Sequence, residues 1–385
     1  MYRMIDKIIY FYIFICAALL VFNLIYIFRS KALERQKRRR EERWRRALTA
    51  FAQSGAAVRE PVGDRPSLSD MDAPLRPHSA AAWRRLSRVG ELTAWYDVLF
   101  GGQPILTGEK LEEYLKAVRL PLLELAWKYK KRNAMERAFF ACIIQSWAAG
   151  SRDGREVFLA PMLAYLEDSS VYCRENVLRA LYTLGSPEAV ARAFDYISSR
   201  QWYHHPKLIS DGLLEFCGTD REAMAAYLWK HCQSWAENFA VAVVQFAANL
   251  PDRPSGGLGE TFYCALVDAK TPQELRFALL RYFRRHKDTR VRQFLLELMA
   301  DPLDDAAGLK IVAASVLAEY PGQDTKDALI GALGSPNWYV RQNAALSLRQ
   351  LGMTAQDRAR IYESNDQYAI DMIRYITKET PQGGE

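Results

Sequence analysis

Histidines and paired carboxylates are the side chains of this chain that could do acid–base or metal chemistry, and their spacing favours neither. The five histidines are His78, the adjacent pair His204 and His205, His231 and His286. None belongs to an H-E-x-x-H sequence, and adjacent histidines before a helix are more often exposed polar residues than metal ligands. The paired carboxylates Asp304 and Asp305 are typical of a helix N-terminus, where the helix dipole favours negative charge.

Cysteine usage gives no sign of metal or disulfide chemistry either. The six cysteines stand far apart with no C-x-x-C pair among them, so we expect buried structural thiols in a reducing compartment. No P-loop, no G-x-G-x-x-G and no G-x-S-x-G sequence occurs. The sequence therefore predicts a protein that is not an enzyme, has no cofactor and no metal, and functions by binding.

Aromatic side chains that recur at a regular place are the first candidate binding feature. They are Tyr172, Trp202, Tyr203, Trp235, Trp338 and Tyr339. Each precedes by 13 to 16 residues a Gly or Pro that closes a helical segment. Trp and Tyr are frequent anchors of protein interfaces, so a shared edge of such rings would bind a partner. The alternative is that these rings plug the turns between successive helix pairs and belong to the core.

A basic run between residues 281 and 292 is the second candidate binding feature. Its arginines are Arg281, Arg284, Arg285, Arg290 and Arg292. The run spans the end of one predicted helix and the start of the next, so its cations would form a small patch that suits an acidic partner segment or lipid head groups. A solvated helix face without a partner is the alternative.

One long apolar run near the N-terminus predicts where in the cell the chain is located. Residues 8–28 carry no charged side chain and would span roughly 30 Å as a helix, about the thickness of the hydrocarbon core of a bilayer. A cleaved signal peptide would have a shorter apolar stretch and a small-residue cleavage site, whereas Phe28 is followed at once by Arg29 and Lys31. The sequence predicts an uncleaved transmembrane anchor over residues 1–29.

The segment after the anchor holds the excess positive charge of the chain. Between Arg29 and Arg46 lie ten Lys or Arg residues and three Glu residues, whereas the N-terminal side of the apolar run offers Arg3 and Lys7. The positive-inside rule then predicts a single-pass inner-membrane protein with its N-terminus outside and residues 29–385 in the cytoplasm. The same cations could attract anionic lipid, or they could set the topology alone.

The charge of the remaining chain argues against a nucleic-acid partner. The net charge of the whole chain is +7, and the basic segment accounts for that excess. A protein that binds nucleic acid would carry its basic excess on the folded domain, and residues 47–385 are close to neutral. We therefore expect no nucleic acid among the partners.

Composition divides the chain into further segments. The basic segment lacks Gly and Pro, which predicts a helix over residues 30–53. Residues 54–80 are rich in Pro and Gly and predict a flexible linker, which would leave the folded part free to sample the membrane surface. Beyond residue 80, apolar residues recur at helical spacing and no alternating strand pattern is present. We expect a helical cap over residues 81–131, a solenoid of helix pairs over 132–378 and a tail over 379–385.

The helix breaks in the predicted solenoid are periodic. They stand at Gly150, Gly185, Gly218, Pro251, Gly322 and Gly352. The first four follow one another at 33 to 35 residues, and a weaker break near Lys287 continues the series. A period of roughly 30 to 36 residues with two helices in each period is typical of an α-solenoid, in which stacking buries the apolar faces that no single pair can bury.

Two stretches of this region align directly. Residues 171–185 (VYCRENVLRALYTLG) and 338–352 (WYVRQNAALSLRQLG) share six of fifteen positions. The shared residues that we expect to have a structural role are Arg174 and Arg341, Asn176 and Asn343, and Gly185 and Gly352. Units that contain valine-arginine near the start and end in leucine-glycine resemble HEAT repeats, in particular the short bacterial type related to the phycobilisome-lyase-like repeats. The resemblance covers roughly residues 132–378 and implies an all-α solenoid whose surfaces bind other proteins.

The function favoured by these features is that of a membrane-anchored cytoplasmic scaffold or adaptor, which binds a membrane-associated partner protein through its HEAT-like solenoid. A second hypothesis is an enzyme or enzyme accessory of the phycobilisome-lyase type, although no bilin-specific motif is present. A third hypothesis is a sensor of anionic lipid surfaces, which depends on residues 29–46 alone.

Overall fold

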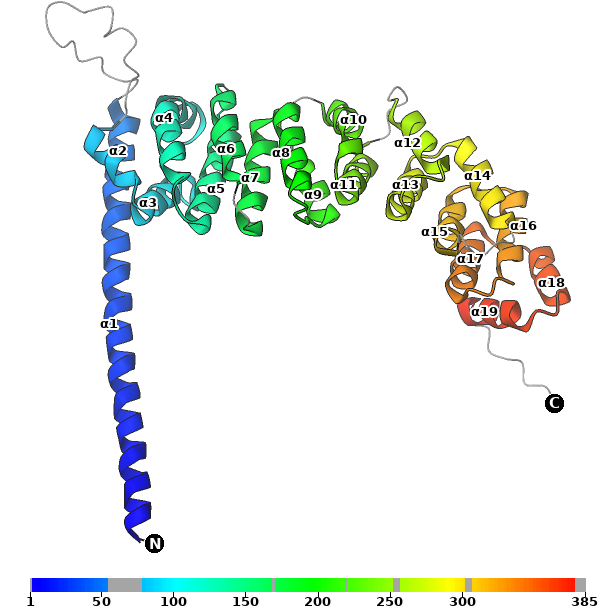
Figure 1. Ribbon diagram of the computed structural model, residues 1–385, viewed down its shortest axis with the longest axis horizontal. Coiled ribbons are helices and arrows are strands. Elements are labelled where there is room, and N and C mark those ends of the chain that lie inside the picture. The colour runs from blue at the N-terminus through cyan, green and yellow to red at the C-terminus, as the bar shows by residue number, and fades with distance from the viewer. Residues whose placement is uncertain are drawn as a thin grey trace, which may run out of the picture. The chain divides into compact units, whose positions relative to one another are not determined.

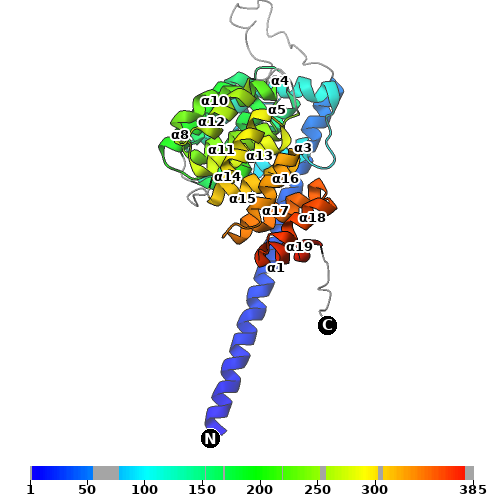
Figure 2. The same ribbon diagram turned by 90° about the vertical axis from the view of Figure 1, so that its right-hand side faces the viewer.

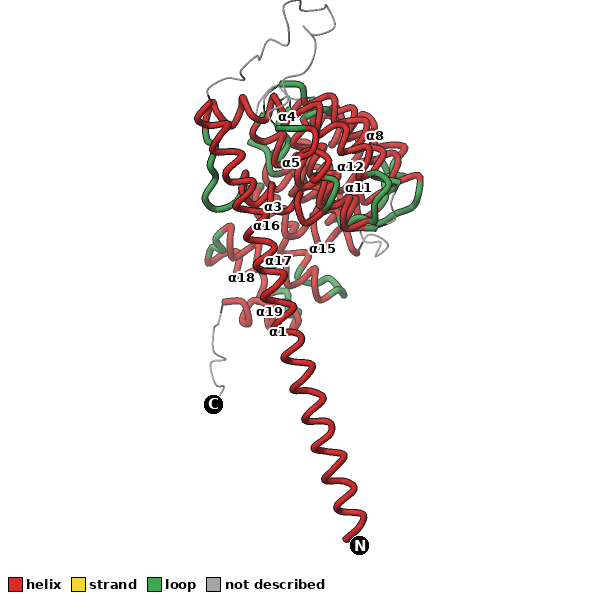
Figure 3. The backbone as a smooth tube through the Cα atoms, turned by 90° about the vertical axis from the view of Figure 1, so that its left-hand side faces the viewer, coloured by secondary structure: helices red, strands yellow, loops and turns green. Residues whose placement is uncertain are grey.

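The computed structural model describes residues 2–54, 78–151, 153–167, 170–218, 220–251, 257–301 and 307–377. In these ranges every regular element is a helix and no strand occurs, as the tube in Figure 3 shows. The all-α fold class predicted from the sequence is confirmed. Most of the predicted linker, the C-terminal tail and the pair Asp304–Asp305 lie outside the described residues.

The chain forms two compact units, and the first ends at Leu184. The helices of this unit 1 are α1 (Tyr2–Ser54), α2 (Ala80–Leu86), α3 (Val89–Phe100), α4 (Gly108–Tyr129), α5 (Ala134–Gly150), α6 (Leu159–Tyr165) and α7 (Val171–Leu184), with a 3-10 turn η1 at Arg155–Phe158. Helices α3, α5 and α7 pack side by side in one layer, and α4 and α6 form a second. Buried tryptophans join the layers, because Trp95 Nε1 donates to Tyr114 Oη and Trp147 Nε1 to the Leu115 carbonyl, both at 2.9 Å.

Helix α1 joins the predicted anchor and the predicted basic helix in one element. Among the described helices it is the one long and apolar enough to cross a membrane, by its length and composition. Its N-terminal part projects away from the rest of unit 1 (Figure 1), and the side chains from Phe14 to Phe28 are exposed. No Gly or Pro interrupts the helix between the apolar run and Ser54.

The C-terminal part of α1 packs on unit 1, which corrects the prediction of a freely tethered domain. Trp44 and Leu48 are buried, and Phe51 lies edge-to-face on Tyr114 of α4 with ring centroids 5.1 Å apart. Helix α3 also packs along this part of α1, and the His78 ring lies edge-to-face on Trp44. The basic helix is therefore an integral element of unit 1, because its apolar residues are covered by α3 and α4.

Unit 2 begins at Gly185. Its helices are α8 (Pro187–Ser199), α9 (Pro206–Leu213), α10 (Arg221–His231), α11 (Glu237–Ala248), α12 (Leu258–Val267), α13 (Gln273–Arg285), α14 (Thr289–Ala300), α15 (Ala307–Val316), α16 (Gln323–Ala332), α17 (Trp338–Leu351), α18 (Ala355–Glu363) and α19 (Gln367–Thr377), with 3-10 turns η2 (Cys232–Ser234) and η4 (Leu317–Glu319). The odd-numbered helices from α9 to α19 pack in succession as one layer, and Figure 2 shows α17 and α19 side by side at its end. Helices α14, α16 and α18 follow one another in the other layer. Unit 2 is therefore built of stacked helix pairs.

The residues shared by the two aligned stretches have structural roles that the structure shows. Gly185 and Gly352 directly follow α7 and α17 with φ of +81° and +79°, a conformation that glycine adopts without strain. Asn343 donates from Nδ2 to the Ile311 carbonyl of α15 at 2.7 Å. In the other stretch, Asn176 accepts from Cys142 of α5 through Oδ1 at 2.8 Å. Each asparagine therefore ties its helix to the preceding helix of the same layer.

Candidate functional site

The aromatic residues predicted as binding anchors lie at the N-terminal ends of helices. Tyr172 is in the first turn of α7, Trp202 and Tyr203 precede α9, and Trp338 and Tyr339 begin α17. All of these are exposed except Trp202, which is half-buried with its ring edge toward Tyr196. The structure therefore leaves most of the predicted rings accessible, and partner binding by them stays a prediction.

Trp235 differs from the other members of this set because it is a core residue. Its side chain is buried, and its ring lies edge-to-face on Phe194 of α8 with centroids 5.4 Å apart. The Phe239 ring of α11 lies 6.4 Å away. For Trp235, burial supports the alternative interpretation of the pattern, in which the ring belongs to the core.

Helices α17 and α19, which pack together near the end of unit 2, carry three exposed rings, and we call Trp338, Tyr339 and Tyr368 the Trp338 surface. These side chains are 46%, 60% and 72% exposed. Arg341, one helical turn after Trp338, lies over the Tyr368 ring with its Cζ 5.2 Å from the centroid. The guanidinium is held in place because its Nη1 donates to the Ser335 carbonyl at 2.6 Å. Aromatic faces beside a fixed guanidinium provide the side-chain types that most often dominate protein interfaces.

The two repeat arginines, Arg174 and Arg341, are among the six residues for which the sequence predicts a structural role. Arg341 also donates to the Pro336 carbonyl at 3.1 Å, so that its guanidinium closes the turn before α17. Arg174 is buried near the start of α7. Neither side chain offers a free cation on the surface, since one is occupied by carbonyls and the other is enclosed.

Arg290 of the basic run forms ion pairs within unit 2. Its guanidinium lies 2.7 Å from Asp288 and 2.6 Å from Glu260 of α12, and over the Tyr263 ring at 4.5 Å. These carboxylates raise the pKa of Arg290, and hydrogen bonding to Arg290 lowers the pKa of Asp288. The contact joins α12 to α14.

The neighbouring cations of the run are engaged in a similar way. Arg292 pairs with Asp324 of α16, Arg284 lies 3.9 Å from Glu319, and Arg285 donates to the Ala248 carbonyl at 3.0 Å; Arg281 is exposed. Most of the positive charge is thus compensated by groups of adjacent helices. The arrangement supports stacking of the helix pairs better than it supports a free basic patch, and binding of an acidic partner here stays a prediction.

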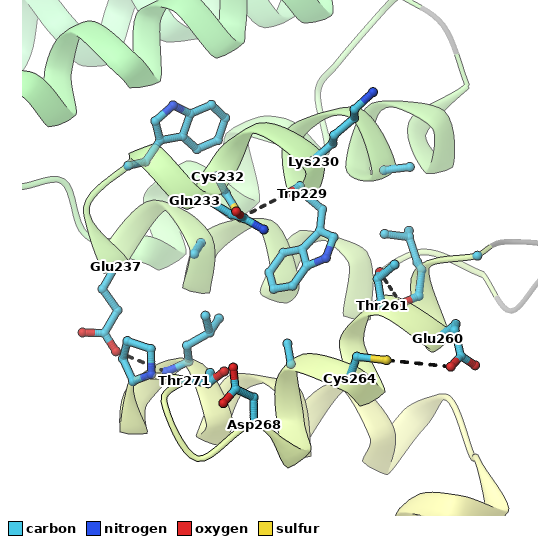
Figure 4. Close-up of a pocket in the computed structure, with 18 residues that line it drawn as sticks. Trp229, Lys230, Cys232, Gln233, Glu237, Glu260, Thr261, Cys264, Asp268 and Thr271 are labelled. Atoms are coloured by element: carbon cyan, nitrogen blue, oxygen red, sulfur yellow. Dashed lines mark hydrogen bonds between the residues drawn. The ribbon is translucent and has the colours of Figure 1, made fainter.

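A groove of about 870 Å³ opens in unit 2 between α10, η2 and α11 on one side and α12 and α13 on the other (Figure 4). The Trp229 ring points into it and packs edge-to-face on Phe262 at 4.7 Å. Two carboxylates of the groove are engaged, because Glu237 accepts from the Leu275 backbone N–H at 3.3 Å and Glu260 pairs with Arg290. No sequence motif marks this groove, since its lining comes from five separate elements.

The thiols of the groove are poor candidates for chemistry. Burial raises the pKa of Cys232 to about 11, so that it stays a neutral thiol at pH 7 and donates to the Trp229 carbonyl at 3.1 Å. Cys264 is exposed and lies 3.8 Å from a Glu260 oxygen. In the part of the chain that the structure describes, no group of three or more His, Cys, Asp or Glu side chains could hold a metal ion.

Comparison with known proteins gives no match. No protein-family model, no curated protein and no solved structure is similar enough to this chain to identify a family. The resemblance to HEAT repeats therefore depends on the aligned residues alone. Any functional argument has to come from the surfaces described above.

Two features of the structure were missed in the sequence. Tyr368 was not singled out, although it lies seven residues before Tyr375 on α19, and both rings are exposed while Ile370 and Ile373 are buried. Two exposed tyrosines on the polar face of an amphipathic helix are a signal that could have been found. The second feature, Glu91 of α3, lies buried among side chains of α1 and has no distinctive sequence context.

Proposed function

We propose that this chain is a single-pass membrane protein whose helical-repeat region is a scaffold for a partner protein, and that the Trp338 surface binds the partner. The observation that carries the proposal is the exposure of Trp338 and Tyr339, whose rings lie 5.1 Å apart at the start of α17, on the helix whose Arg341 lies over the exposed ring of Tyr368. Rings of this size are usually buried, and exposed clusters of them are a feature of interaction sites. The guanidinium of Arg341 is occupied by two backbone carbonyls of the turn before α17, and its contribution to this surface is to stack on the Tyr368 ring.

The anchor and its flanking charges support a location for this scaffold. The apolar run of α1 fits a bilayer, and the cation excess after Phe28 favours a cytoplasmic position for the two units at the inner membrane. A scaffold held there meets membrane-associated proteins at high local concentration. The aligned stretches support HEAT-like repeats, a class whose surfaces serve binding.

The proposal is tested by removing the exposed rings and measuring capture of the partner in native membranes. A photo-crosslinking residue in place of Tyr368 of the full chain would report the partner as an adduct identified by mass spectrometry. We expect Trp338→Ala with Tyr339→Ala to reduce the adduct at least about tenfold, because loss of a packed Trp or Tyr anchor costs about 2 kcal/mol and 1.4 kcal/mol is a factor of ten.

The matched control is Trp127→Ala on α4, a tryptophan with a similar exposed fraction of 44% that lies outside the Trp338 surface. This variant should keep the adduct at the level of the unmodified chain. Equal adduct yields for the double variant and the control would refute the proposal. Circular dichroism of both variants should show unchanged helix content, since the substituted rings are exposed.

A further inference from the structure

The cations of α1 fall into two sets with different surroundings. Lys37, Arg40 and Arg43 face carboxylates of α3, and we call them the clamp set. Arg29, Lys31 and Arg35 are exposed, and no described carboxylate lies within ion-pair distance of them; we call them the lipid set. A count of charges in the sequence does not distinguish the two sets, whereas the contacts of their side chains do.

The clamp set neutralises a buried carboxylate. The side chain of Glu91, in the first turn of α3, is 7% exposed and accepts from Arg43 Nη1 at 3.2 Å and from Trp44 Nε1 at 3.3 Å. Arg40 Nε lies 3.6 Å from the same carboxylate. Lys37 pairs with Asp97 at 3.0 Å, and Asp97 raises the pKa of this lysine. Because a buried carboxylate needs such partners, Arg40 and Arg43 are committed to holding α3, and Lys37 adds an exposed ion pair to the same helix.

Height above the bilayer separates the two sets further. Because α1 is continuous, each residue lies about 1.5 Å farther along the axis than the one before it. Lys31 and Arg35 therefore stand about 4.5 and 10.5 Å beyond Phe28, whereas Arg40 and Arg43 stand about 18 and 22 Å beyond it. The polar head-group layer is roughly 5 to 7 Å thick, and charges are screened over about 8 Å at physiological ionic strength.

We propose that Arg29, Lys31 and Arg35 form a binding surface for anionic lipid head groups of the bilayer, while the clamp set holds unit 1 at a fixed distance above it. The inference depends on α1 crossing the membrane and is independent of partner binding at the Trp338 surface. The exposed side chains of the lipid set follow the apolar run directly, and their charge is complementary to lipid phosphates.

The same contacts determine which end of α3 faces the bilayer. Glu91 lies beside Arg43, and Asp97 lies beside Lys37, which is closer to the apolar run. Helix α3 therefore runs toward the membrane from Glu91 to Asp97 and ends at Phe100 on the bilayer side. The first ion pair stands only about 13 Å beyond Phe28, so unit 1 lies directly above the head groups.

The test measures the preference of the reconstituted full chain for spin-labelled phosphatidylglycerol over spin-labelled phosphatidylcholine in phosphatidylcholine vesicles. The lipid-set variant is Lys31→Gln with Arg35→Gln, which leaves Arg29 in place. Its matched control is Arg39→Gln with Arg45→Gln, two exposed cations about 16 and 25 Å beyond Phe28 that have no described ion-pair partner. Both variants remove two charges from α1 and leave the clamp set intact.

We expect the unmodified chain to prefer the anionic lipid. In the lipid-set variant this preference should be at least about fivefold weaker, because each juxtamembrane cation contributes roughly a factor of five. The control should stay within about twofold of the unmodified chain. The preference should vanish at 1 M salt, where screening acts over about 3 Å. Equal losses in both variants, no preference in the unmodified chain, or a preference that survives 1 M salt would each overturn the proposal.

Discussion

Trp44 gives the sharpest test of whether α1 is an integral part of unit 1. Its side chain is 3% exposed, its ring lies edge-to-face on His78 with centroids 5.4 Å apart, and its Nε1 donates to Glu91 at 3.3 Å. We consider the substitution Trp44→Ala, which removes the ring and this donor together. If the basic helix were a free tether, the same substitution would leave the folded unit unaffected.

The expected cost follows from the burial of the ring. Truncating a buried Trp to Ala costs about 3 to 5 kcal/mol, because transfer free energy is lost and a cavity remains. The Glu91 carboxylate also loses one of its donors and stays buried with Arg40 and Arg43 alone. The control Trp127→Ala removes the same group from a half-exposed site and should cost below about 1 kcal/mol.

The assay is urea denaturation of the full chain in detergent micelles, followed by circular dichroism, with hydrogen exchange to identify the transition of unit 1. With a slope of about 1 to 3 kcal/mol per molar urea, a cost of about 3 to 5 kcal/mol should lower the midpoint of unit 1 by roughly 1 to 5 M in Trp44→Ala. Amides of α3 should exchange faster in the same variant. Identical midpoints and identical α3 exchange for Trp44→Ala and Trp127→Ala would refute the docking of α1.

The remaining predictions concern pH and backbone conformation. Burial lowers the pKa of His78 to about 4, whereas an unfolded histidine titrates near 6.5, so the unfolded chain takes up the proton first as the pH falls. The free energy of unfolding of unit 1 should therefore fall by about 2 kcal/mol between pH 7 and pH 5. Urea midpoints of the His78→Gln variant should lack this contribution to the pH dependence. A variant with the same pH dependence as the unmodified chain would contradict the prediction. Gly352→Ala should lower the stability of unit 2 by about 1 kcal/mol, because φ is +79° there although no atom obstructs a Cβ. Gly331→Ala inside α16 should instead raise the stability of unit 2 by about 0.5 to 1 kcal/mol, because Gly331 is helical and a Cβ there also meets open space. Thermal melts in which Gly352→Ala and Gly331→Ala shift the midpoint in the same direction would contradict these two predictions.

The sequence predicted the helical repeat well because its signals are local. A glycine that must adopt positive φ after α17, and the apolar residues that recur along each helix, can be recognised within a window of fifteen residues. The apolar run of α1 is equally local. These features need no knowledge of what packs against them.

The contacts that could not be predicted join residues far apart in the chain. The hydrogen bond from Trp44 to Glu91 spans 47 positions, and the ring of Trp235 is covered by Phe194, which precedes it by 41. A count of charges after the anchor gives the same total whether a cation faces lipid, water or Glu91. The composition of the linker likewise contains no information about whether the helices that flank it pack together.

The continuity of α1 has a mechanical consequence. A helix whose apolar run is longer than the bilayer is thick accommodates by tilting. From Phe28 to Trp44 the helix extends about 24 Å, so a change of 10° in tilt would move Trp44 sideways by roughly 4 Å. Because α3 is fastened to α1 through Glu91 and Asp97, unit 1 has to follow that movement. If α1 spans a bilayer as proposed, a change in the local thickness of that bilayer would therefore displace unit 1 laterally, as a lever arm does.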